Sequence, residues 1–298
     1  MMKNTTCTAL LTGLTGLGLL TMSACGSSEG GDDPEVAEVS ASSFADGSTM
    51  QRLAEQGSIR IGTKLDLSPI GSKNLQGDVE GFDIEIGKMV AAELGISSDD
   101  IEWVETVSAN REPYLQQKKV DLVIAYYAIT PEREEVVTFA GPYLDGGLDI
   151  LVLEGNPEGI TGPEAAGGKK ICGQSGSTGP AALRADYPDV QLVEFDTMSK
   201  CVDALKQGSV DGVIQANHVL VGAMEKEEGE FELAGTLFDP TDFGIGITKG
   251  DIEFCDFVEG VLRDAEEDGS YAEAWEDTVG RAMDESDAPA LPEQRPCA

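Results

Sequence analysis

Residues 120–133 read Val-Asp-Leu-Val-Ile-Ala-Tyr-Tyr-Ala-Ile-Thr-Pro-Glu-Arg and join an apolar run to a helix-start signal. The apolar run 120–125 predicts a strand, and Thr130 followed by Pro131 predicts the capped first turn of a helix. Ligands bind at the carboxyl ends of strands in open α/β sheets. The backbone N–H groups of a helix start, together with the guanidinium group of Arg133, suit a carboxylate. A capped helix that carries a surface arginine is the alternative interpretation.

A second stretch has the same arrangement. Residues 173–180, Gly-Gln-Ser-Gly-Ser-Thr-Gly-Pro, follow a strand expected at 170–172 and precede a helix expected near Pro180. Small residues let the backbone approach a ligand closely and hydroxyl groups add donors, although an ordinary loop is the alternative. The stretch is not a phosphate-binding P-loop, because its second glycine is not followed by Lys and then Ser or Thr. Two such sites, about 45 residues apart, suggest two lobes that close on one small anionic group.

The rest of the chain alternates between strand and helix patterns. Apolar-rich segments predict further strands, and apolar residues at helical spacing predict helices. This alternation favours the α/β class, with parallel sheets covered by helices. The additional strands are expected at 58–62, 101–107, 149–153, 191–195 and 212–214, and the helices at 86–94, 113–118, 198–205 and 254–265.

The N-terminal region reads as an export signal. Lys3 precedes an apolar run over 9–22, which is shorter than the roughly 20 residues that a bilayer-spanning helix needs. A small residue followed by Cys25 resembles the bacterial lipobox, so residues 1–24 are expected to be a lipoprotein signal peptide and Cys25 the lipidated residue. An ordinary secretory signal is the alternative. Residues 25–50 are polar and are expected to form a flexible tether.

Charge and cysteine content agree with export. The chain has 55 acidic and 20 basic residues, a net charge of −35, which argues against nucleic acid and anionic membrane surfaces as partners. Four cysteines remain after Cys7 and Cys25, and an even number suggests two disulfides with three possible pairings. Proximity favours Cys172 with Cys201 and Cys255 with Cys297. A zinc site is the rival, but there is no C-x-x-C pair and His218 is the only histidine.

Several short motifs, in order along the chain, together resemble one family. The chain is similar to the extracellular solute-binding proteins of family 3, which have the type II periplasmic-binding fold and serve polar amino-acid ABC transporters. Within this family, the branch that the chain resembles is that of the actinobacterial glutamate-binding lipoproteins, because of residues 107–111, Cys172 and 199–202. That resemblance implies a disulfide bridge between Cys172 and Cys201. The matching stretches are 59–63, 80–84, 120–124, 129–133, 139–143, 176–178 and 244–246.

The resemblance implies two lobes joined by two hinge crossovers, near 147 and 245. Lobe 1 would comprise 51–147 and 245–298, including a C-terminal tail, and lobe 2 would comprise 148–244. A ligand bridging Arg133 and Ser177/Thr178 would stabilise the closed form, which docks on a membrane permease. The expected protein is a monomeric, lipid-anchored binding component on the outer face of the membrane, without a cofactor. A receptor that feeds a sensor is an alternative, and an enzyme on the same fold is not expected.

The expected ligand is a small carboxylate-containing polar solute, an amino acid of the glutamate type. The resemblance implies that Arg133 holds the α-carboxylate, helped by backbone N–H groups at Ala128 and Thr178. The aspartate that usually binds the ammonium group is Ala216 here, and the usual aromatic sandwich is Leu67 and Ser108. Either Asn217, Gln215 or a nearby acid such as Asp66 replaces the aspartate, or the ligand has no α-amino group. The expected ligand-binding residues are Lys64, Asp66, Arg111, Tyr126, Ala128, Thr130, Arg133, Ser177, Thr178, Gln215 and Asn217.

Three of these residues have a second interpretation. Lys64 and Arg111 could pair with a side-chain carboxylate of the ligand, or each could be a solvated surface charge. Tyr126 could stack on the ligand or offer its hydroxyl group, or it could simply pack in the core.

Overall fold

The computed structural model describes residues 33–285 and 287–298. The expected signal peptide and Cys25 lie outside these residues. Within the described residues, no helix is both long enough and apolar enough to cross a bilayer.

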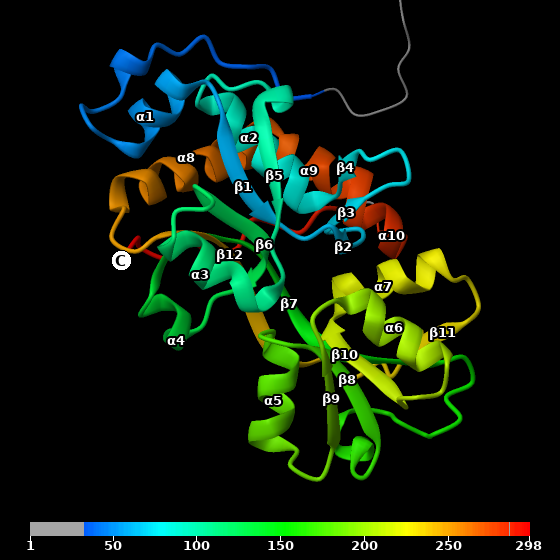
Figure 1. Cartoon of the computed structure of the whole chain (residues 1–298). Coiled ribbons are helices and arrows are strands. Elements are labelled where there is room, and N and C mark those ends of the chain that lie inside the picture. Colours follow the sequence, from blue (N-terminus) through cyan, green and yellow to red (C-terminus); the bar gives the residue numbers. More distant parts are fainter. Residues whose placement is uncertain (1–32, 286) are drawn as a thin grey trace, which may run out of the picture. The chain divides into compact units, whose positions relative to one another are not determined.

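One nine-stranded sheet organises the described chain (Figure 1). Its main order is β5-β1-β6-β12-β7-β10-β8-β9, with β11 paired to β7. Pairing is parallel within β5-β1-β6 and within β10-β8-β9, whereas β7 and β12 are antiparallel to their neighbours. The strands are β1 (Ile59–Thr63), β5 (Ile101–Glu105), β6 (Leu122–Ala128), β7 (Val137–Leu153), β8 (Lys170–Gln174), β9 (Gln191–Phe195), β10 (Gly212–Ala216), β11 (Phe231–Leu233) and β12 (Phe238–Thr248). The α/β class predicted from the sequence is confirmed.

Helices gather around each parallel half of the sheet, and β7 and β12 run between the two groups (Figure 1). We call these groups lobe 1 and lobe 2. Lobe 1 contains β1, β5 and β6 with α1 (Thr49–Gln56), α2 (Phe82–Glu93), α3 (Arg111–Gln116), α4 (Pro131–Glu134), α8 (Ile252–Asp268), α9 (Ser270–Trp275) and α10 (Arg281–Met283), and a small sheet of β2 (Asp66–Leu67), β3 (Gly71–Lys73) and β4 (Val79–Glu80). Lobe 2 contains β8 to β11 with α5 (Thr178–Asp186), α6 (Met198–Lys206) and α7 (Asn217–Lys226).

Strand β7 is much longer than the sequence predicted. We expected a strand only at 149–153, and Pro142 and the glycines at 146–147 are residues that normally break strands. The structure continues the strand through them because β12 pairs alongside from Val137 to Leu148. Pro142 lies opposite a register shift in β12, where the hydrogen-bonded ladder is already interrupted. Its lack of an N–H group therefore costs no regular hydrogen bond between the strands. The crossovers expected near 147 and 245 both fall inside these two strands.

Helix α8 shows why the sequence pattern specifies the packing of lobe 1. Phe254, Val258, Val261 and Leu262 are all buried, and their spacing places them on one face of the helix. The side chain of Asp251 accepts a hydrogen bond from the Phe254 N–H at the helix start, and Gly269 ends the helix in the left-handed conformation, with φ 91°. The helix expected at 254–265 therefore forms, and it extends further at both ends, from Ile252 to Asp268.

The described part of the expected tether, residues 33–50, packs on the rest of the chain. In the described part, the Ala37 N–H donates to the Ala92 carbonyl over 3.1 Å, and Asp33 pairs with Lys88 over 2.9 Å. The ring of Phe44 packs edge-on against Phe257, 5.9 Å between centroids. Residues 33–48 therefore contact α2 and α8, which their polar composition did not indicate.

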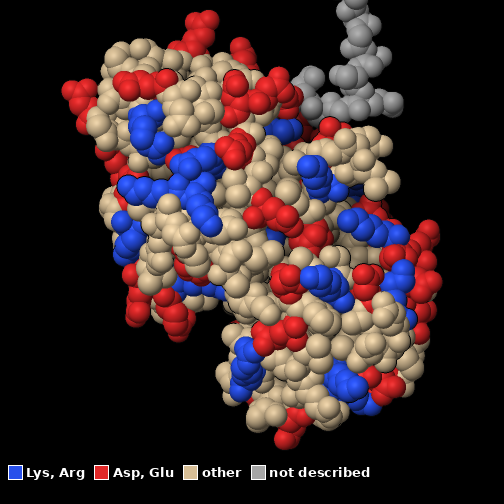
Figure 2. Space-filling view, viewed as in Figure 1, with Lys and Arg blue, Asp and Glu red and all other residues tan. Residues whose placement is uncertain are grey.

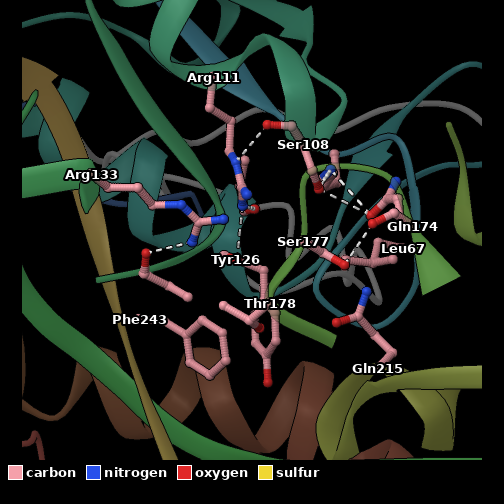
Figure 3. A pocket seen from close by; sticks show the side chains of 13 residues that line it. Leu67, Ser108, Arg111, Tyr126, Arg133, Gln174, Ser177, Thr178, Gln215 and Phe243 are labelled. Carbon is pink, nitrogen blue, oxygen red and sulfur yellow. Dashed lines mark hydrogen bonds between the residues drawn. The ribbon is translucent and has the colours of Figure 1, made fainter. Parts of the chain in front are cut away.

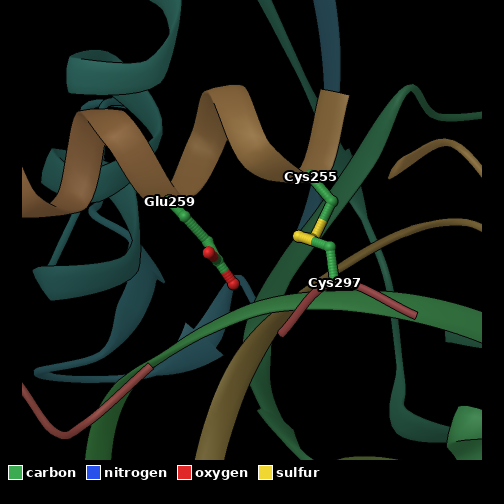
Figure 4. A group of neighbouring side chains, drawn as sticks. All are labelled: Cys255, Glu259 and Cys297. Atoms are coloured by element: carbon green, nitrogen blue, oxygen red, sulfur yellow. A yellow bond between two sulfur atoms is a disulfide. The ribbon is translucent and has the colours of Figure 1, made fainter. Parts of the chain in front are cut away.

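Both disulfides favoured by sequence proximity are present, Cys172–Cys201 and Cys255–Cys297, with Cα–Cα distances of 5.5 and 6.0 Å. The second joins α8 to the extended C-terminal tail (Figure 4). Among the described side chains, Cys255, Glu259 and Cys297 form one group whose potential metal-ligand atoms lie within 4.8 Å of each other. Both sulfur atoms of this group are used in the disulfide, so neither can act as a thiolate ligand.

Candidate functional site

A small cavity lies between the two lobes, at the carboxyl ends of β6 and β8. Lobe 1 supplies its cationic side chains, and lobe 2 supplies hydroxyl and amide groups (Figure 3). The lining residues are Lys64, Leu67, Ser108, Arg111, Ala125, Tyr126, Ala128, Arg133, Gln174, Ser177, Thr178, Gln215 and Phe243.

Arg111 is held by backbone carbonyl groups. It begins α3, and its guanidinium group donates to the carbonyls of Ser108, Ala125, Tyr126 and Gly176 over 3.1–3.4 Å. The guanidinium carbon also lies 4.3 Å from the ring centroid of Tyr127. Burial, followed by the nearby positive charge of Arg133, lowers the pKa of Arg111 to about 9. Arg111 is therefore a fixed, buried cation and not a solvated surface charge.

Arg133 occupies the position expected from the sequence. Thr130 caps α4 by accepting from the Arg133 N–H over 3.4 Å, with Pro131 at the first helical position. The guanidinium group donates to the Ala128 carbonyl over 2.7 Å and to the Gly176 carbonyl over 2.9 Å. Its Nε lies 3.4 Å from a carboxylate oxygen of Glu112. The side chain therefore extends from lobe 1 to the backbone of lobe 2.

Lys64, just after β1, is the third cation. Its side chain is buried and its Nζ donates to Ser108 Oγ over 2.8 Å and to Gln174 Oε1 over 3.4 Å. Burial and then the positive charge of Arg111 hold the pKa of Lys64 well below its usual value. Because Gln174 belongs to lobe 2, Lys64 contacts both lobes.

The lobe 2 side of the cavity is a strand-to-helix turn. Strand β8 ends at Gln174, and α5 begins at Thr178 with Ser177 as the N-cap residue. The Ser177 hydroxyl group donates to the Gln174 carbonyl over 2.7 Å. Gly173 is required here, because a Cβ atom would lie 2.6 Å from the ring of Pro180. Ser177 and Thr178 line the cavity, and the first N–H groups of a helix such as α5 have no partner within it.

Tyr126 is packed and strained. Its φ is 47°, which is uncommon for a residue other than glycine. Its N–H donates to the buried carboxylate of Asp83 over 2.8 Å, its ring stacks on Phe243 at 3.8 Å, and its hydroxyl group lies 2.8 Å from His218 Nδ1. Residues held in such conformations often lie at functional sites, where the surrounding structure enforces them.

The carboxyl group of Asp83 accepts a second hydrogen bond, from the Tyr143 hydroxyl over 2.6 Å. Burial raises the pKa of Asp83 to about 7, against the opposite effect of these hydrogen bonds.

Three of the expected site residues do not line the cavity. Thr130 acts as the helix cap described above. The Asn217 side-chain oxygen accepts from the Gly147 N–H over 3.3 Å, and Asp66 accepts from the Met198 N–H over 3.0 Å. Of the three candidates for an ammonium partner, only Gln215 reaches the cavity, and its Oε1 already accepts from the Ala216 N–H over 3.0 Å.

Three lining residues, Ala125, Gln174 and Phe243, were not among the expected ligand-binding or sandwich positions. Gln174 lies in the second candidate stretch, 173–180, just beyond the strand predicted at 170–172, so its position near a carboxyl strand end was an available signal. Phe243 lies in β12, and we did not predict a strand there. Leu67 and Ser108, expected at the positions of an aromatic sandwich, do line the cavity.

The cavity favours an anion, although the molecular surface is acidic. Among the described residues that line it, three are cationic and none is a carboxylate. By contrast, Asp and Glu side chains are spread over the face of both lobes that Figure 2 shows. Buried cations need a compensating charge, so the cavity suits an anionic group such as a carboxylate.

Comparisons with known proteins agree with this geometry. Residues 59–279 match the family model of bacterial extracellular solute-binding proteins, family 3. The chain is 34% identical to the glutamate-binding protein GluB of Corynebacterium efficiens, covering 88% of this chain and 86% of the relative. It is 30% identical to the ABC transporter glutamine-binding protein GlnH of Bacillus subtilis, over 86% and 91% of the two chains.

A solved structure described as a solute receptor for L-cysteine of Neisseria gonorrhoeae superposes with a TM-score of 0.76 at 32% identity, covering 81% of this chain and 98% of that one. The two-lobed type II fold expected from the sequence is therefore confirmed. Taken with the inter-lobe cavity, these similarities show that the chain belongs to the bacterial extracellular solute-binding proteins of family 3.

Proposed function

We propose that this protein is the substrate-binding component of an ABC importer and captures a carboxylate-containing amino acid of the glutamate type. The observation that carries the proposal is the convergence of Lys64, Arg111 and Arg133 on one cavity. Arg133, with the start of α5, would bind the α-carboxylate. Lys64 and Arg111 are then available for a second, side-chain carboxylate. The names of the glutamate- and glutamine-binding relatives support this choice.

The ammonium group of such a ligand would have to use neutral acceptors. Ser108, Gln174 and Gln215 line the cavity and carry oxygen atoms, but none offers a negative charge. This arrangement supports a second candidate ligand, a dicarboxylate without an α-amino group. Such a molecule would match the cations without leaving an ammonium group beside them.

A calorimetric titration separates the two candidates. The protein is unfolded and refolded to remove carried-over ligand, and then titrated with glutamate, aspartate, glutamine and arginine. Glutarate, 2-oxoglutarate and citrate form the comparison set. Micromolar binding of glutamate, with weaker binding of glutarate, supports the amino-acid assignment. Binding only of acids that lack an amino group replaces it with the second candidate, and binding of none contradicts both.

The lipid anchor and the importer partner are part of the same proposal. A monomer anchored through Cys25 would present its closed form to a membrane permease. Incorporation of labelled palmitate into the wild-type protein, and its absence in a Cys25→Ser variant, would support the anchor. Co-purification with a permease, and not with a sensor kinase, would support the importer. Equal labelling of the Cys25→Ser variant would contradict the lipid anchor, and co-purification with a sensor kinase instead of a permease would contradict the importer role.

A further inference from the structure

The two lobes also touch outside the ligand cavity, through the segment that follows β1. Asp66 and Ser68 of lobe 1 lie against α6 and α7 of lobe 2. Neither Asp66 nor Ser68 lines the ligand cavity. We call Asp66, Ser68, Met198 and Gly222 the latch.

The first contact of the latch completes a helix cap. The N-cap residue of α6, Thr197, makes no side-chain capping hydrogen bond. The Met198 N–H instead donates to the Asp66 carboxylate over 3.0 Å. A carboxylate at this position satisfies a free N–H group and interacts favourably with the helix dipole. Lobe 1 thus supplies the cap of a lobe 2 helix.

The second contact requires a residue without a side chain. Gly222 lies in the middle of α7 with ordinary helical geometry, where alanine is normally the better residue. A Cβ atom on Gly222 would lie 1.8 Å from the Ser68 carbonyl oxygen, 2.5 Å from its carbonyl carbon and 2.8 Å from Pro69 Cδ. These atoms belong to the backbone and to a proline ring, so no side-chain rotation relieves the overlap. Glycine is needed only where Ser68 approaches α7.

We propose that the latch forms only when the lobes close, and that it is therefore a determinant of ligand affinity outside the cavity. The inference rests on the proposed function, in which closure traps the solute. Interactions made only in the closed state add to the free energy that favours the liganded protein. A change that blocks the latch therefore weakens binding without touching the ligand.

The test compares three variants of the purified protein by calorimetry with the tightest ligand of the panel above. Gly222→Ala is expected to weaken binding at least tenfold, since closure must be incomplete. Asp66→Ala removes the cap and is expected to weaken binding about fivefold. The matched control is Gly260→Ala in α8, a helical glycine whose added Cβ atom would meet only the end of the Arg263 side chain at 3.9 Å. Its affinity is expected to equal that of the wild type.

Thermal unfolding of the unliganded proteins separates the latch from a folding defect. Alanine favours a helix more than glycine does, so Gly222→Ala is expected to unfold at the same or a higher temperature than the wild type. Weaker binding together with undiminished stability supports the latch. Unchanged affinity in Gly222→Ala overturns it, while the proposed function still stands on the wild-type titration.

Small-angle scattering provides a readout that needs no assignment of the ligand. The Gly222→Ala protein is expected to have a larger radius of gyration than the wild type under the conditions that close the latter. If the wild type binds nothing in the panel, the proposed function fails, and scattering alone then decides on the latch. Equal radii for the wild type and the Gly222→Ala protein, both with and without added ligand, overturn the latch.

Discussion

Replacing Arg133 by methionine tests whether the cavity binds an anion through this side chain. Methionine keeps part of the side-chain volume and removes the charge. Arg133 is the better choice for this test than Arg111, which holds four carbonyl groups. Of the two carbonyl groups that Arg133 contacts, that of Gly176 would keep its hydrogen bond from Arg111. Few buried acceptors are therefore left without a partner.

The expected loss of affinity follows from the loss of a buried charge pair. Removing one partner of such a pair costs about 2–5 kcal/mol, which weakens binding by about 30-fold to several thousand-fold. Arg133→Lys keeps the charge but loses the planar two-pronged donor, so its affinity should fall between wild type and Arg133→Met. Burial lowers the pKa of Arg133, because desolvation disfavours the charged guanidinium group. The stability of the unliganded Arg133→Met protein should therefore not decrease.

Calorimetric titration with the same ligand measures the three affinities, and thermal unfolding measures stability. Arg184→Met is the matched control, because Arg184 lies in α5 with a side chain that is 57% exposed and far less able to affect a buried ligand. The reasoning is refuted if Arg133→Met binds within threefold of the wild type. It is also refuted if Arg184→Met loses as much affinity as Arg133→Met.

Two further predictions concern stability. The pKa of Asp83 is raised from 3.8 to about 7, so its contribution to stability is present below about pH 4 and is lost as the pH rises through 7. By denaturant unfolding, the wild type should lose up to about 4 kcal/mol between pH 4 and 8 relative to Asp83→Asn, and parallel pH profiles would contradict this. The Cys255–Cys297 bridge closes a loop with a sequence separation of 42. In the chain-entropy model, the Cys255→Ala/Cys297→Ala double variant should lose about 4 kcal/mol of unfolding free energy in guanidinium chloride, and an unchanged midpoint would contradict this.

Much of the fold was predictable because local patterns report local structure. The apolar runs at 120–125 and 212–214 and the helical spacing at 254–265 correspond to β6, β10 and α8. Strand β12 and the passage of β7 through Pro142 were not predictable in this way. Each of these two strands depends on pairing with the other, about 100 residues away in the chain. A proline inside a strand is tolerated only where such pairing is interrupted.

The candidate site was predictable to a similar extent. Strand ends followed by helix starts indicated Arg133, Ser177 and Thr178, and all three line the cavity. Asp66 and Asn217 were also expected there, but the structure uses their oxygen atoms to accept backbone N–H groups of lobe 2 and of β7. Local sequence does not reveal which of several nearby polar side chains turns toward a cavity, because that depends on the elements packed around it.

The sequence by itself determined the alternation of strands and helices, the two strand-to-helix turns and the pairs of cysteines close enough to bond. These features depend on residues near one another in the chain. Only the tertiary structure decided that Lys64 and Arg111 are buried beside Arg133, and that Gly222 meets the carbonyl of Ser68. The physical reason is that burial and close approach arise between elements that are far apart in sequence. The residue pattern within one element does not indicate which other element will pack against it.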